Sequence, residues 1–138
     1  MVESEVVEAV DRWFQRYYGA GRYCGECTLR SGRRADLIYV ARADSIHVVE
    51  AKAVASEWHT AFRQLRDYPA NYKWFALPLD EYYPDNAFIA SECSQRGYGL
   101  LLVSGGPSHR IVTVRRRPQY RRGRFNCSWP SAFVLRQN

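Results

Sequence analysis

The sequence has 138 residues, enough for one compact domain that buries about two-thirds of the surface of its unfolded chain. Hydrophobic residues make up 46% and aromatic residues 14% of it, a composition that excludes an intrinsically disordered chain. No apolar run approaches the roughly 20 residues that a membrane-spanning helix needs, and the acidic start over residues 1–5 lacks the pattern of a secretory signal. We therefore expect a single-domain cytoplasmic protein over residues 1–138, with no membrane partner.

The net charge of +6 is distributed unevenly along the chain. No Asp or Glu follows Glu92, and nine arginines do, whereas the first 92 residues carry a formal charge of −3. An arginine-rich segment without acids suits a polyanion such as nucleic acid, although a solvated strand and tail has the same composition. Lysine is scarce, 2 residues against 18 arginines, so the two that are retained, Lys52 and Lys73, invite a specific explanation.

The four cysteines do not have the spacing of a familiar metal site. Cys24 and Cys27 have the spacing of half a zinc site, but Cys93 and Cys127 are isolated and no paired histidine completes the set. We expect free, reduced and partly buried thiols.

The hydrophobic periodicity and the turn residues predict an α/β protein. Ser56 is the expected N-cap of the second helix, and Pro69 ends that helix. In chain order the expected elements are a helix over 3–18, strands over 23–30, 34–42 and 45–53, a helix over 56–68, a strand over 73–77, a helix over 85–95, a strand over 98–104 and a candidate edge strand over 110–117. The order αβββαβαβ predicts a mixed central sheet flanked by helices.

Charged residues interrupt the apolar faces of the second and third predicted strands. Asp36 lies on the face of the second strand that is otherwise apolar, and Glu50 and Lys52 lie on the corresponding face of the third. If a five-residue loop joins these strands, the numbers of paired residues sum to 86, and Asp36 lies opposite Glu50 with Cβ atoms about 5 Å apart. Two carboxylates so close repel each other, which favours a hard divalent cation between them.

Lys52 completes a site for hydrolysis, because a lysine at this place can position or activate an attacking water. The alternative is an exposed hairpin end with an ordinary Glu–Lys pair and an unrelated aspartate.

Asp36, the apolar strand after it and then Glu50-Ala51-Lys52 resemble the motif of the PD-(D/E)XK nuclease superfamily, which includes RecB-type nucleases, Holliday-junction resolvases and many restriction enzymes. The expected αβββαβ order over residues 3–76 is similar to the restriction-endonuclease-like core of that family. The family's proline before the aspartate is replaced by an alanine. The resemblance implies a deoxyribonuclease that uses Mg²⁺ or Mn²⁺, with Asp36, Glu50 and the Ala51 carbonyl as metal ligands and Lys52 as a catalytic residue.

Members of this family often carry a glutamate on the first helix that reaches the metal site. At 100° per residue, Glu3 lies within about 25° of the centre of the apolar stripe of the first predicted helix, whereas Glu5 and Glu8 lie more than about 100° away. Glu3 is therefore the candidate for a further metal ligand. A carboxylate that only favours the helix dipole is the alternative.

Gln64 and Tyr68 resemble the Gln-x-x-x-Tyr motif of RecB-type nucleases, on the helix after the Glu-x-Lys strand. The resemblance implies that both contact the active-site lysine or the DNA backbone. On a helix, positions i and i+4 share a face, and this pair flanks the apolar stripe. Ordinary surface polarity is the alternative.

Several arginines are candidates for binding phosphates of nucleic acid, although a surface position alone explains them almost as well. They are Arg33, Arg34 and Arg63 near the predicted centre and Arg115, Arg116, Arg117, Arg121 and Arg122 in the basic segment over about 110–124. Tyr120 and Phe125 are interleaved with them for base stacking. His47 and His109 have no obvious partner.

Two rival functions remain. The first is a nucleic-acid-binding module that keeps the fold but does not cleave, and the second is an interaction subunit. The partner surface of the second would comprise Trp13, Tyr72, Trp74, Tyr82 and Tyr83. We favour a nuclease, because a non-cleaving relative has no reason to keep two repelling carboxylates beside a lysine. A homodimer or a partner protein is expected to supply specificity.

Overall fold

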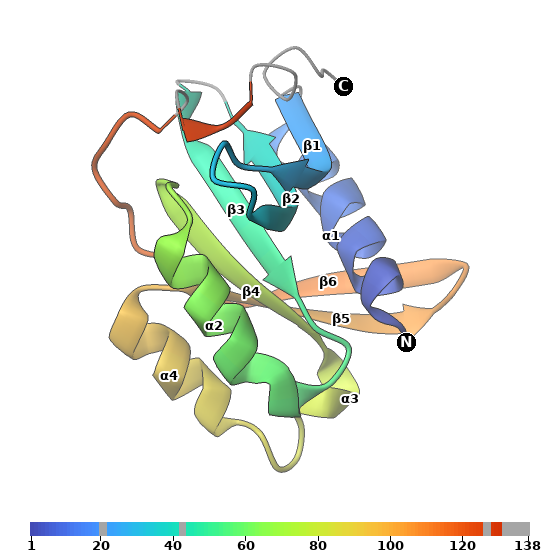
Figure 1. Cartoon of the computed structure of the whole chain (residues 1–138). Helices are drawn as coiled ribbons and strands as arrows, with labels where there is room; N and C mark the ends of the chain where they lie inside the picture. Colours follow the sequence, from blue (N-terminus) through green and yellow to red (C-terminus); the bar gives the residue numbers. More distant parts are fainter. Residues whose placement is uncertain (20–21, 42–43, 126–127, 131–138) are drawn as a thin grey trace.

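The computed structural model describes residues 1–19, 22–41, 44–125 and 128–130. Its centre is a mixed sheet in which the strands lie in the order β1-β2-β3-β4-β5-β6, so each is beside its neighbours in the sequence (Figure 1). The strands are β1 (Arg22–Thr28), β2 (Arg34–Val40), β3 (Ile46–Ala51), β4 (Tyr72–Pro78), β5 (Gly99–Gly106) and β6 (His109–Arg116). Strands β3, β4 and β5 are parallel, and the other pairs are antiparallel.

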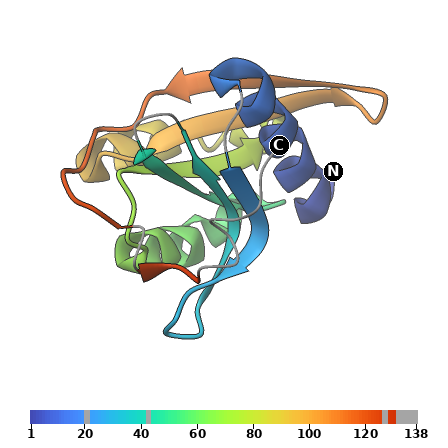
Figure 2. The ribbon, with the colours of Figure 1, turned by 90° about the horizontal axis from the view of Figure 1, so that it is seen from above.

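Helices cover both faces of the sheet. They are α1 (Glu3–Tyr18), the 3-10 turn η2 (Ala55–Glu57), α2 (Trp58–Asp67), α3 (Leu79–Tyr82) and α4 (Phe88–Arg96). Figure 2 shows α1 on one face of the sheet and α2 on the other, with α4 beside α2 in Figure 1. The expected mixed sheet flanked by helices is confirmed, with α3 as an additional short element.

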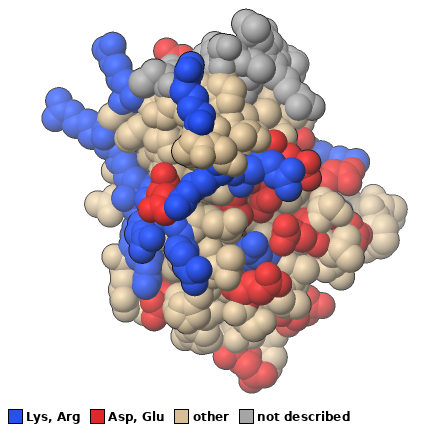
Figure 3. Space-filling model, viewed as in Figure 1, with Lys and Arg blue, Asp and Glu red and all other residues tan. Residues whose placement is uncertain are grey.

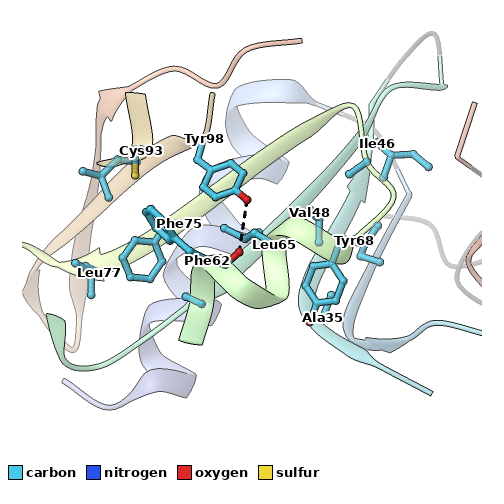
Figure 4. Close-up of a cluster of buried hydrophobic side chains, with 14 of the residues drawn as sticks. Ala35, Ile46, Val48, Phe62, Leu65, Tyr68, Phe75, Leu77, Cys93 and Tyr98 are labelled. Atoms are coloured by element: carbon cyan, nitrogen blue, oxygen red, sulfur yellow. Dashed lines mark hydrogen bonds between the residues drawn. The ribbon is translucent and has the colours of Figure 1, made fainter. Parts of the chain in front are cut away.

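Two hydrophobic clusters, one on each face, hold these layers together. On the α1 face, Val10 and Phe14 of the amphipathic helix pack with Trp74 of the sheet. On the α2 face, Phe62 and Leu65 pack with strand residues that include Val48 and Phe75, and the ring of Tyr68 lies beside Ala35 (Figure 4). Because β3 and β4 are covered on both sides, their residues are nearly all buried.

The pairing of β2 with β3 follows the predicted register. Val40 lies opposite Ile46, and the ladder continues in step to Leu37 opposite Val49. The next step of the same register is Asp36 and Glu50, the pair of carboxylates that the sequence singled out. Glu50 points toward the α2 face, where its carboxyl group meets the Tyr68 hydroxyl, and Asp36 lies beside it near the start of β2.

Some predicted boundaries are wrong. Ser56 is not an N-cap: it lies inside η2, and α2 begins at Trp58 after a residue whose side chain makes no capping hydrogen bond. The helix α3 was not expected after Pro78, which was interpreted only as the end of a strand. The expected edge strand is β6, and the predicted end of the second strand at Arg42 lies outside the described residues.

Cys24 and Cys93 are free thiols, and Cys27 and Cys93 are buried. Cys127 lies outside the described residues. None of the described helices combines the length and the apolar character needed to cross a bilayer.

Candidate active site

Asp36 and Glu50 bind the backbone of each other's strand. The amide of Asp36 donates a hydrogen bond to Glu50 Oε1 at 3.3 Å, and the amide of Ala51 donates one to Asp36 Oδ2 at 2.9 Å. Glu50 is 1% exposed, whereas Asp36 is partly exposed. The two carboxyl groups therefore lie side by side, one in the core and one at its edge.

Tyr68 holds the buried carboxyl group from the α2 face. Its hydroxyl lies 2.9 Å from Glu50 Oε1 and 2.7 Å from the carbonyl oxygen of Arg34, and it donates its proton to these acceptors. The helix α2 ends at Asp67, and the backbone of Tyr68 is extended, with φ −81° and ψ 132°. This change of direction turns the ring into the core, where it is 2% exposed.

The position of Tyr68 corrects the interpretation of the Gln-x-x-x-Tyr pair. Tyr68 does not flank the core as a helical neighbour of Gln64, because it lies beyond the helix and inside the core. Its hydroxyl contacts Glu50 rather than Lys52 or a surface open to DNA. Gln64 is half-buried on α2, and its Oε1 is a buried acceptor without a protein partner in the described part of the chain.

The environment of Glu50 favours its neutral form. Burial, and next the negative charge of Asp36, raise the pKa of the Glu50 carboxyl to about 8, although the hydrogen bond from Tyr68 acts in the opposite direction. At pH 7 the side chain therefore keeps its proton unless a positive charge comes near. Burial and the charge of Glu50 also raise the pKa of Tyr68, so its hydroxyl stays a donor.

Lys52 and Glu3 meet where β3 ends. Lys52 is 8% exposed, and its Nζ lies 4.0 Å from Glu3 Oε1 in the first turn of α1. Partial burial, followed by the charge of Asp36, raises the pKa of Glu3, and Lys52 opposes this shift. The other two glutamates of α1 are bound elsewhere, Glu5 to Arg110 and Glu8 to Arg12. Of the three glutamates of α1, the apolar stripe thus selected Glu3, which is the one that lies beside Lys52.

This group of side chains can bind a hard cation with few protein ligands. Asp36 and Glu50 supply adjacent carboxylate oxygens, and Glu3 and Glu57 add negative charge at the same edge. Within the described ranges, no set of three or more His, Cys, Asp or Glu side chains is close enough to hold a metal ion by itself. Mg²⁺ accepts such a site, because it often binds through one or two carboxylates and completes its octahedron with water and phosphate oxygens.

Glu57 was not expected at this site from the sequence. The sequence indicates Glu57 only by its position in the first helical turn after the Glu-x-Lys strand. An acidic residue is common at the start of a helix, so this position alone does not predict a functional role.

His47 has a partner, contrary to the prediction. It is 3% exposed, and its Nδ1 accepts a hydrogen bond from the indole Nε1 of Trp74 at 3.0 Å. Burial lowers the pKa of His47 to about 3. The sequence indicated only that His47 faces away from Glu50, and that is where it lies, on the α1 face.

A basic groove lies between α2 and α4, with a volume of about 290 Å³. Its arginines are Arg63, Arg66 and Arg96, and its aromatic walls include Phe62 and Tyr98. Figure 3 shows Lys and Arg side chains gathered over α2 and α4 on the left of the molecule, whereas acidic side chains lie mostly to the right. Only Arg63 of the three was predicted, although the i, i+3 spacing of Arg63 and Arg66 was available in the sequence.

The other predicted arginines do not form one continuous track. Arg33 is paired with Asp67, and Arg34 lies 4.0 Å from Glu26. Arg121 lies over the ring of Tyr98, beside the basic groove.

The arginines at the end of β6 and just after it contact different parts of the protein, and the pairing of β6 with β5 shifts register beside them. Arg115 interacts with Tyr82 and Tyr83, whereas Arg117 binds Tyr17 on the α1 side. Arg116 is half-buried, and Arg122 is exposed.

Two of the five aromatic residues predicted to form a partner surface are not on the surface at all. Trp74 and Tyr82 are both 0% exposed, and they belong to the core on opposite faces of the sheet. The remaining aromatic residues do not share one surface, since Tyr72 lies at the start of β4 and Tyr83 lies after its end.

The comparisons with known proteins give one structure of similar fold and one matching family. A solved structure of similar fold is the SPO1766 protein of unknown function from Silicibacter pomeroyi, with 15% identity, a TM-score of 0.64, and coverage of 88% of this chain and 75% of that chain. No curated protein matches this chain. Residues 3–126 match the family model described as "DNA repair protein MmcB-like". The match spans most of the sequence, and the chain therefore belongs to the MmcB-like family of DNA repair proteins.

Proposed function

We propose that this protein is a metal-dependent deoxyribonuclease that hydrolyses phosphodiester bonds of DNA at Asp36, Glu50 and Lys52. The observation that carries the proposal is the placement of the buried Glu50 carboxyl directly beside Asp36, with Lys52 at the end of the same strand. Buried like charges are costly, and a divalent cation is the ligand that relieves the cost. The description of the family as DNA repair proteins supports DNA as the substrate, and so does the resemblance to the PD-(D/E)XK motif.

Each residue of the centre has a distinct role in this proposal. Asp36 and Glu50 would hold Mg²⁺ or Mn²⁺, which when bound polarises the phosphoryl group and acidifies a water. The Ala51 amide and the Tyr68 hydroxyl fix the two carboxylates, so little reorganisation is needed when the ligand binds.

Lys52 would place a positive charge and a hydrogen-bond donor next to the reacting phosphate, where negative charge develops in the transition state. Glu3 orients that ammonium group from α1. We also propose the Ala51 carbonyl as a metal ligand, on the ground of the family resemblance.

DNA would be held by the basic groove, on the same face of the sheet as Glu50. The guanidinium groups of Arg63, Arg66 and Arg96 suit backbone phosphates, and such contacts bind without reading sequence. This groove is also the observation that favours the second candidate, a DNA-binding module without cleavage, because it does not depend on the carboxylates.

Cleavage assays separate the two candidates. Linear, circular, single-stranded and branched DNA would be incubated with Mg²⁺, Mn²⁺ or EDTA and the wild-type, Asp36→Asn, Lys52→Met or Lys73→Met protein. Lys73→Met is the matched control: it makes the same change at the only other lysine, whose Nζ binds the Arg66 carbonyl. We expect metal-dependent cleavage that falls by at least about 100-fold in Asp36→Asn and Lys52→Met and persists in Lys73→Met.

Thermal unfolding of each variant would establish that it is folded. Equal DNA binding by all four proteins with no cleavage of any substrate would contradict the nuclease and favour the binding module.

A further inference from the structure

A second cavity, of about 560 Å³, lies on the α1 face at the opposite end of β3 from Lys52. The cavity lies beside the end of α1 and the first residues of β3 and β4. Its walls include Tyr17, Tyr18, Ser45, His47, Tyr72 and Arg117. Asp36, Glu50 and Lys52 do not line this cavity, so it is separate from the candidate active site.

Aromatic rings form two sides of this cavity. The ring of His47 stacks on Tyr72, with centroids 4.6 Å apart and an interplanar angle of 20°. On the α1 side, Tyr17 stacks on Trp13 at 5.1 Å and is 54% exposed. Rings held in this way by neighbouring rings lose little entropy when a further planar group stacks on them.

Among the described residues that line the cavity, Arg117 carries a positive charge and none carries a negative charge. Arg117 donates a hydrogen bond to the Tyr17 hydroxyl at 2.7 Å, and its guanidinium group lies 5.5 Å from the centre of that ring. None of the described lining residues is Asp or Glu. An anionic ligand therefore meets an arginine that is already held beside an aromatic face.

The cavity also contains directional hydrogen-bonding groups. Nδ1 of His47 accepts the indole proton of Trp74, so the neutral imidazole carries its own proton on Nε2. The ring therefore keeps one donor beyond its bond to Trp74, and the Ser45 hydroxyl adds a group that both donates and accepts. A flat ligand with polar edges fits such a lining better than a purely apolar one.

We infer that this cavity binds an unpaired nucleotide of single-stranded DNA, with the base stacked against Tyr17 or Tyr72 and the adjacent phosphate on Arg117. The choice of DNA rests on the proposed function; the planar, anionic character of the ligand rests on the cavity itself. An unpaired base is required, because a base inside a duplex has both faces covered by its neighbours.

Binding of a fluorescein-labelled oligothymidylate, followed by anisotropy in EDTA, tests the inference. All variants would be made in the Lys52→Met background, so that neither metal nor cleavage affects the result. Two matched controls exist. Tyr83→Ala removes a tyrosine of nearly equal exposure, 52%, outside this cavity, and Arg12→Ala removes an equal charge from an exposed arginine of α1 that does not line it.

We expect Tyr17→Ala and Arg117→Ala each to weaken binding of the single strand by about 10-fold, the size of one lost base-stacking or phosphate contact. Tyr17→Phe keeps the ring and should bind nearly as well as the parent protein, which guards against a loss through misfolding. The two control variants should change affinity by less than about 2-fold, and a fully paired duplex should bind all proteins alike.

Unchanged affinity in Tyr17→Ala and Arg117→Ala would overturn the inference, and so would equal losses in the control variants. Because cleavage plays no part in this measurement, its failure leaves the nuclease proposal standing. Conversely, a protein that never cleaves DNA but shows the expected differences would keep this site and lose the proposed activity.

Discussion

The strand β3 carries two buried titratable side chains, His47 and Glu50, and the two faces of the sheet satisfy them in different ways. On the α1 face, aromatic rings surround His47, and burial lowers its pKa to about 3 while Trp74 donates to its free nitrogen. On the α2 face, burial and the adjacent Asp36 raise the pKa of Glu50 to about 8. Both groups are neutral at pH 7, but only Glu50 faces a charge that repels its ionised form.

This difference separates simple burial from a cation site. A buried histidine that is neutral and accepts a hydrogen bond from Trp74 needs no added proton or cation. A buried carboxyl group beside a second carboxyl group is complete only with a proton or a cation, so the same degree of burial serves different purposes on the two faces.

Substitution at these two positions should have unequal effects on stability. We expect His47→Ala to lower the free energy of unfolding at pH 7 by about 3 kcal/mol, because it leaves a cavity among aromatic rings and an unpaired Trp74 indole. Glu50→Gln should change it by less than about 1 kcal/mol, since the amide is neutral and still accepts a hydrogen bond from Tyr68. Urea unfolding of both variants measures this, and equal losses would contradict the comparison.

The pH dependence of stability should differ for the two groups. The pKa of Glu50 is raised from 4.5 to about 8 in the folded state, so its stabilising proton is lost as the pH rises through this range. The pKa of His47 is lowered from 6.5 to about 3, so its contribution is lost as the pH falls through that range. Above pH 6.5, only Glu50 of these two residues makes the free energy of unfolding depend on pH.

Without metal, we therefore expect the free energy of unfolding to fall by about 2 kcal/mol between pH 6.5 and 8, relative to Glu50→Gln. Urea unfolding of both proteins at matched pH values in EDTA would measure this difference. Parallel curves for the two proteins would show that Glu50 titrates normally.

The sequence was sufficient for the fold and for the register of the first hairpin. Alternation along β2 and β3 and a short connection leave little freedom, since a slip of one residue would turn every apolar side chain to the wrong face. For this reason Asp36 and Glu50 could be paired before the structure was known. Glu3 could be selected for a similar reason, because the apolar stripe of α1 fixes the rotation of the helix.

Contacts that depend on a change of backbone direction or on a crossing between parallel strands could not be predicted. Tyr68 was placed by helical geometry, but its extended backbone after the last turn of α2 sends the ring to Glu50. The bond between His47 and Trp74 joins two parallel strands that a crossover of 20 residues connects, and no local pattern indicates it. The arginines at the end of β6 were treated as one track, whereas Arg115 contacts Tyr82 and Tyr83 and Arg117 contacts Tyr17.

Proton release on metal binding tests the central claim most directly, namely that Asp36 and Glu50 form a cation site. Isothermal titration calorimetry of Mn²⁺ at pH 7, in two buffers of different ionisation enthalpy, counts the protons that leave the protein. With a Glu50 pKa of about 8, binding should release close to one proton, whereas Glu50→Gln should bind more weakly and release none. Tight binding without proton release, or equal binding by Asp36→Asn, would contradict the account.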